Sequence, residues 1–354
     1  MSVNLDQNNI YERLDPNGMG AHIAGLPAQC RHAWKEANKF SLPGGFRQVQ
    51  NIVVLGMGAS GIGAELAGGL ADTAKVKVTV IRGYSLPDGI DNRTLVIGSS
   101  YSGMTEETIS AFTESLKTDC LRLVITTGGD LADLATKKNI PIFRIKYNAP
   151  PRAALAWSLI PLLVIFRQIG ILKDLDGDIP SMARLLDRLA AKYGTDSVTA
   201  TNPAKAIAKR MYGKQPVIYS AGFLGAAAQR WKTQINENSK NWAFYETFSE
   251  LNHNAIEGYR FPASSRKSAY VVMLRSSLLD GRLLRRYEVT SDILRRSGVK
   301  REEIDATGND RLSQMMSLVY LGDWTSYYLA MLNGVDPSPV DRIAFLKKRL
   351  SAPL

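Results

Sequence analysis

The sequence predicts an α/β protein made of two doubly wound parallel sheets. Two observations support this prediction: apolar strand patterns alternate with helical patterns, and a strand–glycine turn–helix unit occurs twice. The two copies read VVLGMGASGIGAELA, starting at Val53, and VIYSAGFLGAAAQRW, starting at Val217. A chain of 354 residues also exceeds the ~100–200 residues of one domain. We expect a first domain over residues 1–170, a helical connection and linker over 171–200, and a second domain over 201–354.

Each element follows from a local pattern. Runs rich in β-branched and apolar residues predict strands at residues 51–55, 76–81, 94–98, 121–126, 142–145, 216–220 and 269–274. Helical spacing predicts helices at residues 62–70, 105–116, 131–137 and 226–236, and a helical C-terminus. The longest apolar run, residues 153–166, is shorter than the ~20 residues of a membrane-spanning helix and predicts a buried core helix. The arginine-rich stretch 275–301 has the spacing of an amphipathic helix with a solvated face.

Composition narrows the class of protein. Hydrophobic residues make up 45% and charged residues 22% of the chain, which is typical of a globular protein and excludes a disordered or fibrous one. Two cysteines, Cys30 and Cys120, cannot build a disulfide framework or a four-cysteine zinc site, and the polar start lacks the apolar core of a secretory signal. We therefore expect a cytoplasmic protein with no membrane partner. The net charge of +11 favours acidic ligands such as phosphorylated metabolites, and no long basic block predicts nucleic-acid binding.

The first glycine turn matches a dinucleotide-binding fingerprint. Gly56, Gly58 and Gly61 have the G-x-G-x-x-G spacing between a predicted strand and a predicted helix. That fingerprint requires an acidic residue at the end of the next strand to hold the ribose, and this strand ends instead in Ile81-Arg82. NAD is therefore disfavoured. NADP stays open, because Arg82 could accept a 2′-phosphate.

A second turn points to a phosphate ester. Ser100, Ser102 and Thr105 place three hydroxyl groups at the mouth of a predicted helix, together with Gly103. The unpaired N–H groups of a helix N-terminus bind anions, and added hydroxyl donors suit a compact dianion. An ordinary helix cap is an alternative for Thr105, which precedes two glutamates. That alternative leaves both serines unexplained.

Several segments, taken in order, give the chain a family resemblance. They are GMGASG, RGYSLP, SYSGMTEET, PPRAAL, NENSKNWAFYETFSELNHNAIEGY and VDPSPVDRIAFLKKRL. The chain resembles the sugar isomerase (SIS) domain proteins, and within them the bifunctional phosphoglucose/phosphomannose isomerases, from about Asn51 to Leu350. Two positions depart from the family pattern: Ala59 replaces a glycine, and Met104 stands where asparagine is common.

The resemblance implies a site for each step of an aldose–ketose isomerase. Such an enzyme opens a sugar ring and moves a proton between C1 and C2 through a cis-enediol(ate), using a base, a proton donor and a cation. Glu237 corresponds to the base, and His253, supplied to the partner subunit's site in a homodimer, to the ring-opening residue. Arg152 would stabilise the enediolate or bind phosphate, and Lys347 would assist ring opening, although Lys348 is adjacent. The residues implied to bind the substrate phosphate are Gly58, Ser60, Ser100, Ser102 and Thr105.

Each of these residues also has an ordinary structural interpretation. Most glutamates are solvated, as Glu237 would be at a helix end, but a carboxylate there opposes the helix dipole. One histidine in a loop, such as His253, is usually structural, and Arg152 could be a surface arginine between a strand and a helix. Ser338 is a candidate for the residue that gives tolerance of both C2 epimers.

The expected substrates are glucose 6-phosphate, mannose 6-phosphate and fructose 6-phosphate, with no cofactor. No metal is expected either, because the spacing of His22, Cys30 and His32 matches no common metal site. Two other functions stay open. One is a non-catalytic SIS-domain sensor that binds a sugar phosphate, and the other is a nicotinamide-dependent oxidoreductase built on the first glycine turn.

Overall fold

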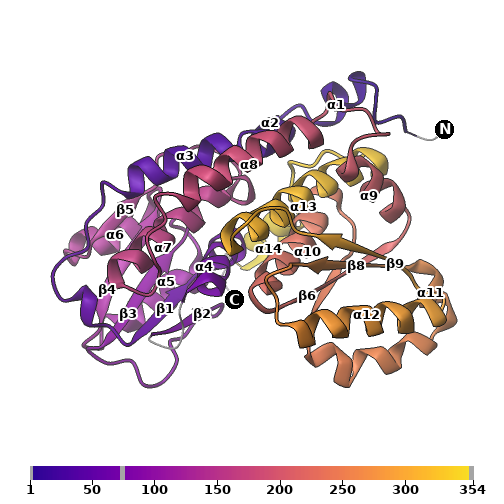
Figure 1. The fold of residues 1–354 in the computed structure, drawn as a ribbon. Coiled ribbons are helices and arrows are strands. Elements are labelled where there is room, and N and C mark those ends of the chain that lie inside the picture. Colours follow the sequence, from indigo (N-terminus) through magenta and orange to yellow (C-terminus); the bar gives the residue numbers. More distant parts are fainter. Residues whose placement is uncertain (1–2, 72–75, 351–354) are drawn as a thin grey trace.

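The computed structural model describes residues 3–71 and 76–350, which form two α/β halves joined by long helices (Figure 1). Each half contains one sheet in which every described strand pairing is parallel. The predicted fold class is therefore confirmed. Within the described ranges, no helix combines the length and hydropathy needed to cross a membrane.

The first sheet has the strand order β2-β1-β3-β4-β5. Its strands are β1 (Asn51–Leu55), β2 (Lys77–Ile81), β3 (Thr94–Ser99), β4 (Leu121–Thr126) and β5 (Ile142–Arg144). The helices of this half are α4 (Gly58–Leu70), α5 (Glu106–Ser115), α6 (Gly129–Lys137) and α7 (Leu155–Ile169). Helix α4 starts four residues earlier than the predicted 62–70, so most of the glycine turn forms its first turn. Helix α7 is the predicted buried core helix.

The second sheet has the order β7-β6-β8-β9. Its strands are β6 (Gln215–Ala221), β7 (Phe244–Phe248), β8 (Ala269–Arg275) and β9 (Lys300–Asp305). The sequence predicted the two central strands and missed both edge strands. Strand β9 reads KREEID and is mostly half-buried or exposed, so it lacks the apolar run on which strand prediction depends.

The remaining helices cover the sheets and connect the halves. In the second half they are α9 (Pro203–Met211), α10 (Gly225–Ser239), α11 (Ala263–Ser268), α12 (Gly281–Arg296), α13 (Arg311–Asn333) and α14 (Asp341–Leu350). Helices α1 (Asn9–Leu14), α2 (Met19–Ala24), α3 (Leu26–Ala37) and α8 (Asp178–Tyr193) complete the chain, and α3 and α8 lie side by side (Figure 1). Short 3₁₀ segments are η1 (Phe46–Gln48), η2 (Pro151–Ala153), η3 (Gly222–Leu224), η4 (Glu250–His253) and η5 (Ala255–Arg260). The predicted amphipathic helix is α12.

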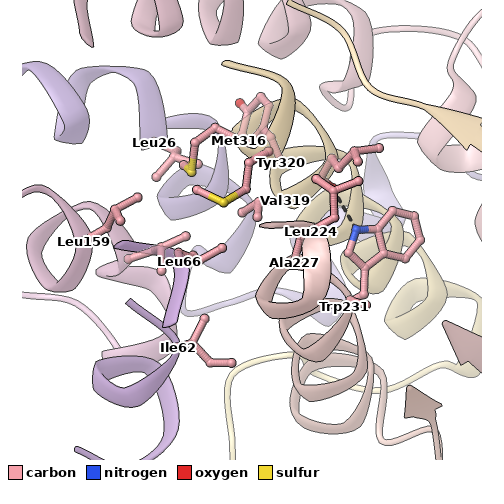
Figure 2. Packing of buried hydrophobic residues seen from close by; sticks show 14 of the residues in the cluster. Leu26, Ile62, Leu66, Leu159, Leu224, Ala227, Trp231, Met316, Val319 and Tyr320 are labelled. Carbon is pink, nitrogen blue, oxygen red and sulfur yellow. Dashed lines mark hydrogen bonds between the residues drawn. The ribbon is translucent and has the colours of Figure 1, made fainter. Parts of the chain in front are cut away.

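One hydrophobic core runs through both halves. Figure 2 shows Ile62 and Leu66 of α4 facing Ala227 of α10 and the apolar side chains of α13. Helix α13 is buried on all sides along 21 of its residues, as expected for a helix at the centre of a protein. The indole Nε1 of Trp231 donates a hydrogen bond of 2.7 Å to the carbonyl of Leu318. This packing fixes α10, which carries Glu237, against the first half.

Candidate active site

Two turns meet at the carboxyl edge of the first sheet. Strands β1 and β3 are parallel neighbours, so the segments that follow them, residues 56–61 and 100–105, lie side by side. The Oγ of Ser60 accepts a hydrogen bond of 3.3 Å from the backbone N–H of Tyr101. We call residues 100–105 the hydroxyl loop.

Inside the hydroxyl loop, the three hydroxyl groups have different environments. Ser100 is buried, and its Oγ lies 2.8 Å from Oγ1 of Thr105 and accepts a bond from the N–H of Gly103. Ser102 is exposed, and its Oγ accepts a bond of 3.2 Å from the N–H of Met104. Because Ser60 and Ser102 act as acceptors from the backbone, each keeps its own O–H proton to donate. Ser100 instead stabilises the loop through hydrogen bonds with other residues of the loop.

Thr105 does not act as the ordinary helix cap that the sequence allowed. It occupies the N-cap position of α5, but its side chain makes no capping hydrogen bond and is paired with Ser100. The N–H groups in the first turn of α5 are therefore left without that partner, as an anion site at a helix N-terminus requires.

The hydroxyl loop is held in place by a close backbone approach. Gly103 has a φ of +68°, and a Cβ atom there would lie 1.7 Å from the carbonyl oxygen of Gly128. The carbonyl of Gly103 accepts a hydrogen bond of 3.0 Å from the N–H of Leu131 in α6. Met104, which departs from the family pattern, accepts a bond from the N–H of Asp130 through its sulfur at 3.4 Å. The loop is thus tied to α6 by its own backbone and by this side chain.

Arg152 is a buried charge whose segment is linked to the hydroxyl loop. It lies in η2, is only 5% exposed, and donates from Nε to Oδ1 of Asn238 at 2.8 Å. Its Nη2 donates to the carbonyls of Pro337 at 2.5 Å and Ser338 at 2.9 Å. Burial lowers the pKa of Arg152, and the neighbouring carboxylate of Glu237 opposes that change. The interpretation of Arg152 as a surface arginine is therefore wrong.

Glu237 lies beside this buried cation. Its Oε2 is 3.7 Å from Nη1 of Arg152, and its side chain is 30% exposed. Glu237 also lines a cavity of about 390 Å³ with Lys240, Val340 and Ile343, between the end of α10 and the start of α14. It is not simply a solvated residue at a helix end, because one side faces a fixed guanidinium and another faces a cavity.

A continuous set of contacts joins the hydroxyl loop to Arg152. The Oη of Tyr101 donates to the carbonyl of Tyr147 at 2.5 Å and accepts from the N–H of Ala149 at 3.0 Å. On the other side, Ser158 of α7 donates to the carbonyl of Ala59 at 3.2 Å. The segment that carries Arg152 is thus fixed against both turns of the first sheet.

His253 and Lys347 are not brought to Glu237 within one chain. His253 is exposed at the end of η4, and no hydrogen bond or ion pair among the described residues joins it to Glu237 or Arg152. Lys347 is exposed on α14. Arg82, which is exposed, forms an ion pair with Glu65 of α4.

The candidate metal-binding residues lie in ordinary packing environments. The ring of His32 packs edge-on against Trp157, Nδ1 of His22 lies 3.4 Å from the hydroxyl of Tyr147, and Cys30 is a buried free thiol. Across residues 3–71 and 76–350, no three His, Cys, Asp or Glu side chains are grouped closely enough to hold a metal ion.

Sequence reasoning missed two residues of this site. Asn238 and Lys240 lie in the segment NENSK beside Glu237, and both bind groups from distant parts of the chain. Their only local signal was the position of that segment at the end of a predicted helix.

Several known proteins are similar to this chain. A family profile, bacterial phospho-glucose isomerase C-terminal SIS domain, matches residues 200–350. A bifunctional phosphoglucose/phosphomannose isomerase of Caldicellulosiruptor bescii is 38% identical over 93% of this chain and 98% of its own. One of Aquifex aeolicus is 35% identical over 85% and 90%. A solved glucose-6-phosphate isomerase like protein from Thermus thermophilus has a TM-score of 0.62 at 20% identity, covering 95% and 98% of the two chains, which shows a shared fold.

The two parallel sheets and the hydroxyl loop thus define a protein built from sugar isomerase domains. The similarity extends over nearly the whole length of the chain. This chain belongs to the bifunctional phosphoglucose/phosphomannose isomerase family.

Proposed function

We propose that the protein interconverts fructose 6-phosphate with glucose 6-phosphate and with mannose 6-phosphate. The observation that carries this proposal is the carboxylate of Glu237, held 3.7 Å from the buried guanidinium of Arg152 at the edge of a cavity. A base beside a fixed cation is what proton transfer through an enediolate requires. A sensor that only binds sugar phosphate has no use for this pair.

The substrate phosphate binds at the hydroxyl loop in this proposal. Ser60 and Ser102 donate their O–H protons to phosphate oxygens, and the first-turn N–H groups of α5 add further donors. Gly58, at the start of α4, leaves room for the anion because nothing lies within 4 Å of the place where its Cβ would be. Ser100 and Thr105 keep the loop in shape through their mutual hydrogen bond.

The chemical step relocates two protons within the sugar, one from C2 to C1 and one from O2 to O1, and shifts an electron pair between C1 and C2. With the ring open, Glu237 removes the proton from C2 of the aldose, and the C2–H electron pair forms the C1–C2 double bond of an enediolate. The former carbonyl oxygen takes the negative charge, which Arg152 stabilises. Protonation at C1 by the same Glu237, with transfer of the O2 proton to O1, then gives the ketose. No oxidant or reductant is consumed.

Ring opening requires groups that one chain does not place at Glu237. We infer that His253 acts in the partner subunit's site within a homodimer, and that Lys347 of α14 assists it. Exposed apolar side chains are consistent with a further subunit: Trp242 is 71% exposed and Phe345 67% exposed.

The test is a coupled assay that offers each hexose 6-phosphate in turn to the purified protein, with and without a metal chelator. We expect turnover of both aldoses and the same rate after chelation. Turnover of neither would overturn the proposed function. Activity lost on chelation and restored by zinc would overturn the proton-transfer mechanism described here.

A substitution tests the base. Glu237→Gln keeps the shape of the side chain but removes the base, so we expect kcat to fall by about 10²–10⁴-fold while substrate still binds. Isothermal titration measures the binding, and Glu12→Gln, at an exposed position on α1, is the control. Normal turnover by Glu237→Gln would remove Glu237 as the base.

A further inference from the structure

Lys240 makes contacts that its sequence position does not suggest. It follows the last residue of α10, and its Nζ donates to the carbonyl of Glu237 at 2.5 Å, of Pro339 at 2.7 Å and of Pro337 at 3.3 Å. Three carbonyl acceptors use three N–H donors, which only the charged ammonium offers. One side chain thus joins the end of α10 to residues 337–339, which we call the proline turn.

The left-handed backbone conformation of Lys240 indicates that the lysine side chain is needed at this position. Its φ is +57°, in the left-handed region, and Asn139 is the only other non-glycine residue with positive φ in the described ranges. Glycine is the usual residue just after a helix in this conformation, because a Cβ is sterically unfavourable there. A lysine at such a position indicates that its side chain provides something that glycine could not.

The proline turn is held from two sides. The carbonyl of Pro337 accepts hydrogen bonds from both Lys240 and Arg152, and Arg152 also binds the carbonyl of Ser338. Burial and the nearby Arg152 lower the pKa of Lys240, whereas the carboxylates of Asp336, Glu237 and Asp341 favour its charged form. The ammonium of Lys240, an exposed residue, therefore lies at the edge of the cavity with three carbonyl acceptors and with charges of both signs nearby.

We propose that Lys240 is a positioning residue that locks the catalytic end of α10 to the turn leading into α14. This role rests on the isomerase function proposed above. Lys240 fixes the carbonyl of Glu237 and thereby the backbone from which the base projects. It also fixes the start of α14, the helix that carries Lys347. A small misplacement of a reacting group costs on the order of 100-fold in rate, so losing this lock lowers kcat.

The test compares three substitutions at this position. Lys240→Met keeps the length without donors, Lys240→Gly relieves the left-handed backbone without donors, and Lys240→Arg keeps the charge. We expect the Met and Gly variants both to lose about 10–100-fold in kcat, with the KM for glucose 6-phosphate changed less than about threefold, because the phosphate binds in the other half. Lys240→Arg regains part of the loss. Lys192→Met, at an exposed position on α8, is the control and keeps wild-type kcat.

A second measurement separates this role from the proposed activity. Hydrogen exchange reports how firmly α14 is held, and we expect faster exchange over residues 341–350 in the Met and Gly variants but not in Lys192→Met. If the wild-type protein proves inactive on both sugars, the proposed function fails and the exchange data still decide whether Lys240 locks the turn. Wild-type kcat and unchanged exchange in Lys240→Gly would overturn the positioning role.

Discussion

Ser60, at the start of α4, and Ser102, in the hydroxyl loop, show how the backbone can orient a hydroxyl group for the proposed phosphate. Each accepts a backbone N–H, which orients the oxygen and leaves the hydroxyl proton to donate elsewhere. Ser100 instead is 2% exposed and paired with Thr105. The three hydroxyls of the loop look equivalent in the sequence, but the fold leaves Ser102 exposed and pairs Ser100 with Thr105 inside the loop.

This division gives a prediction for Ser102. Ser102→Ala removes one donor to a charged phosphate, a hydrogen bond of about 1.5–3 kcal/mol, so we expect KM to rise by about 10–100-fold with kcat little changed. Steady-state kinetics with glucose 6-phosphate measure both constants. Ser181→Ala, at an exposed position on α8, is the matched control and keeps both. An unchanged KM for Ser102→Ala would contradict the assignment of the phosphate to this loop.

At the scale of elements, the site depends on where helices begin and end. The hydroxyl loop precedes α5, Glu237 is in the last turn of α10, and the cavity lies where α14 begins. Main-chain groups left unpaired at these ends are the ones that bind ligands or charged side chains. A substitution that disturbs the backbone of a loop beside such a helix end therefore tests whether the shape of that loop matters for the site.

Gly103 provides that test. Gly103→Ala would place a Cβ 1.7 Å from the carbonyl oxygen of Gly128, in addition to the cost of a positive φ. We expect it to lose ~1–3 kcal/mol more stability than Gly89→Ala, and to lose phosphate affinity as well. Gly89 has a φ of +80° with nothing within 4 Å of its Cβ position, so it isolates the effect of the backbone angle, about 1–2 kcal/mol. Chemical denaturation and substrate titration measure the two effects, and equal losses in both variants would show that the contact with Gly128 does not matter.

At the scale of the molecule, one chain holds Glu237, the proposed base, and the hydroxyl loop but leaves His253 at the surface. His253 of η4 and Glu237 of α10 both belong to the second half, so a movement of one half against the other would not bring them together. A second copy of the chain is the simpler source of the missing group.

A complementation experiment tests the shared site. Glu237→Gln and His253→Ala are each expected to be nearly inactive alone. When equal amounts are unfolded and refolded together, half of the dimers are mixed, and one of their two sites has both groups, so about a quarter of wild-type activity returns. Mixing without unfolding, before subunits exchange, is the control. No recovery, with mixed dimers shown by native mass spectrometry, would place both residues in one chain's site.

The local sequence was enough to predict much of this protein. Apolar runs and glycine turns predicted the first sheet and the two central strands of the second, because strand and helix periods are properties of neighbouring residues. Both missed strands, β7 and β9, lie at sheet edges and bury little, and β9 also lacks an apolar pattern. Family resemblance then directed attention to Glu237 and Arg152, which the fold brings together.

What the sequence alone determined is the α/β class, the repeated strand–turn–helix unit and the hydroxyl loop before α5. Only the tertiary structure decided that Arg152 is buried and bound to Asn238, which lies 86 residues further along the chain. It alone placed the ammonium of Lys240 on the proline turn. The physical reason is that turns and helix ends are set by adjacent residues, whereas a buried charge finds its partners only when distant segments pack around it and exclude water.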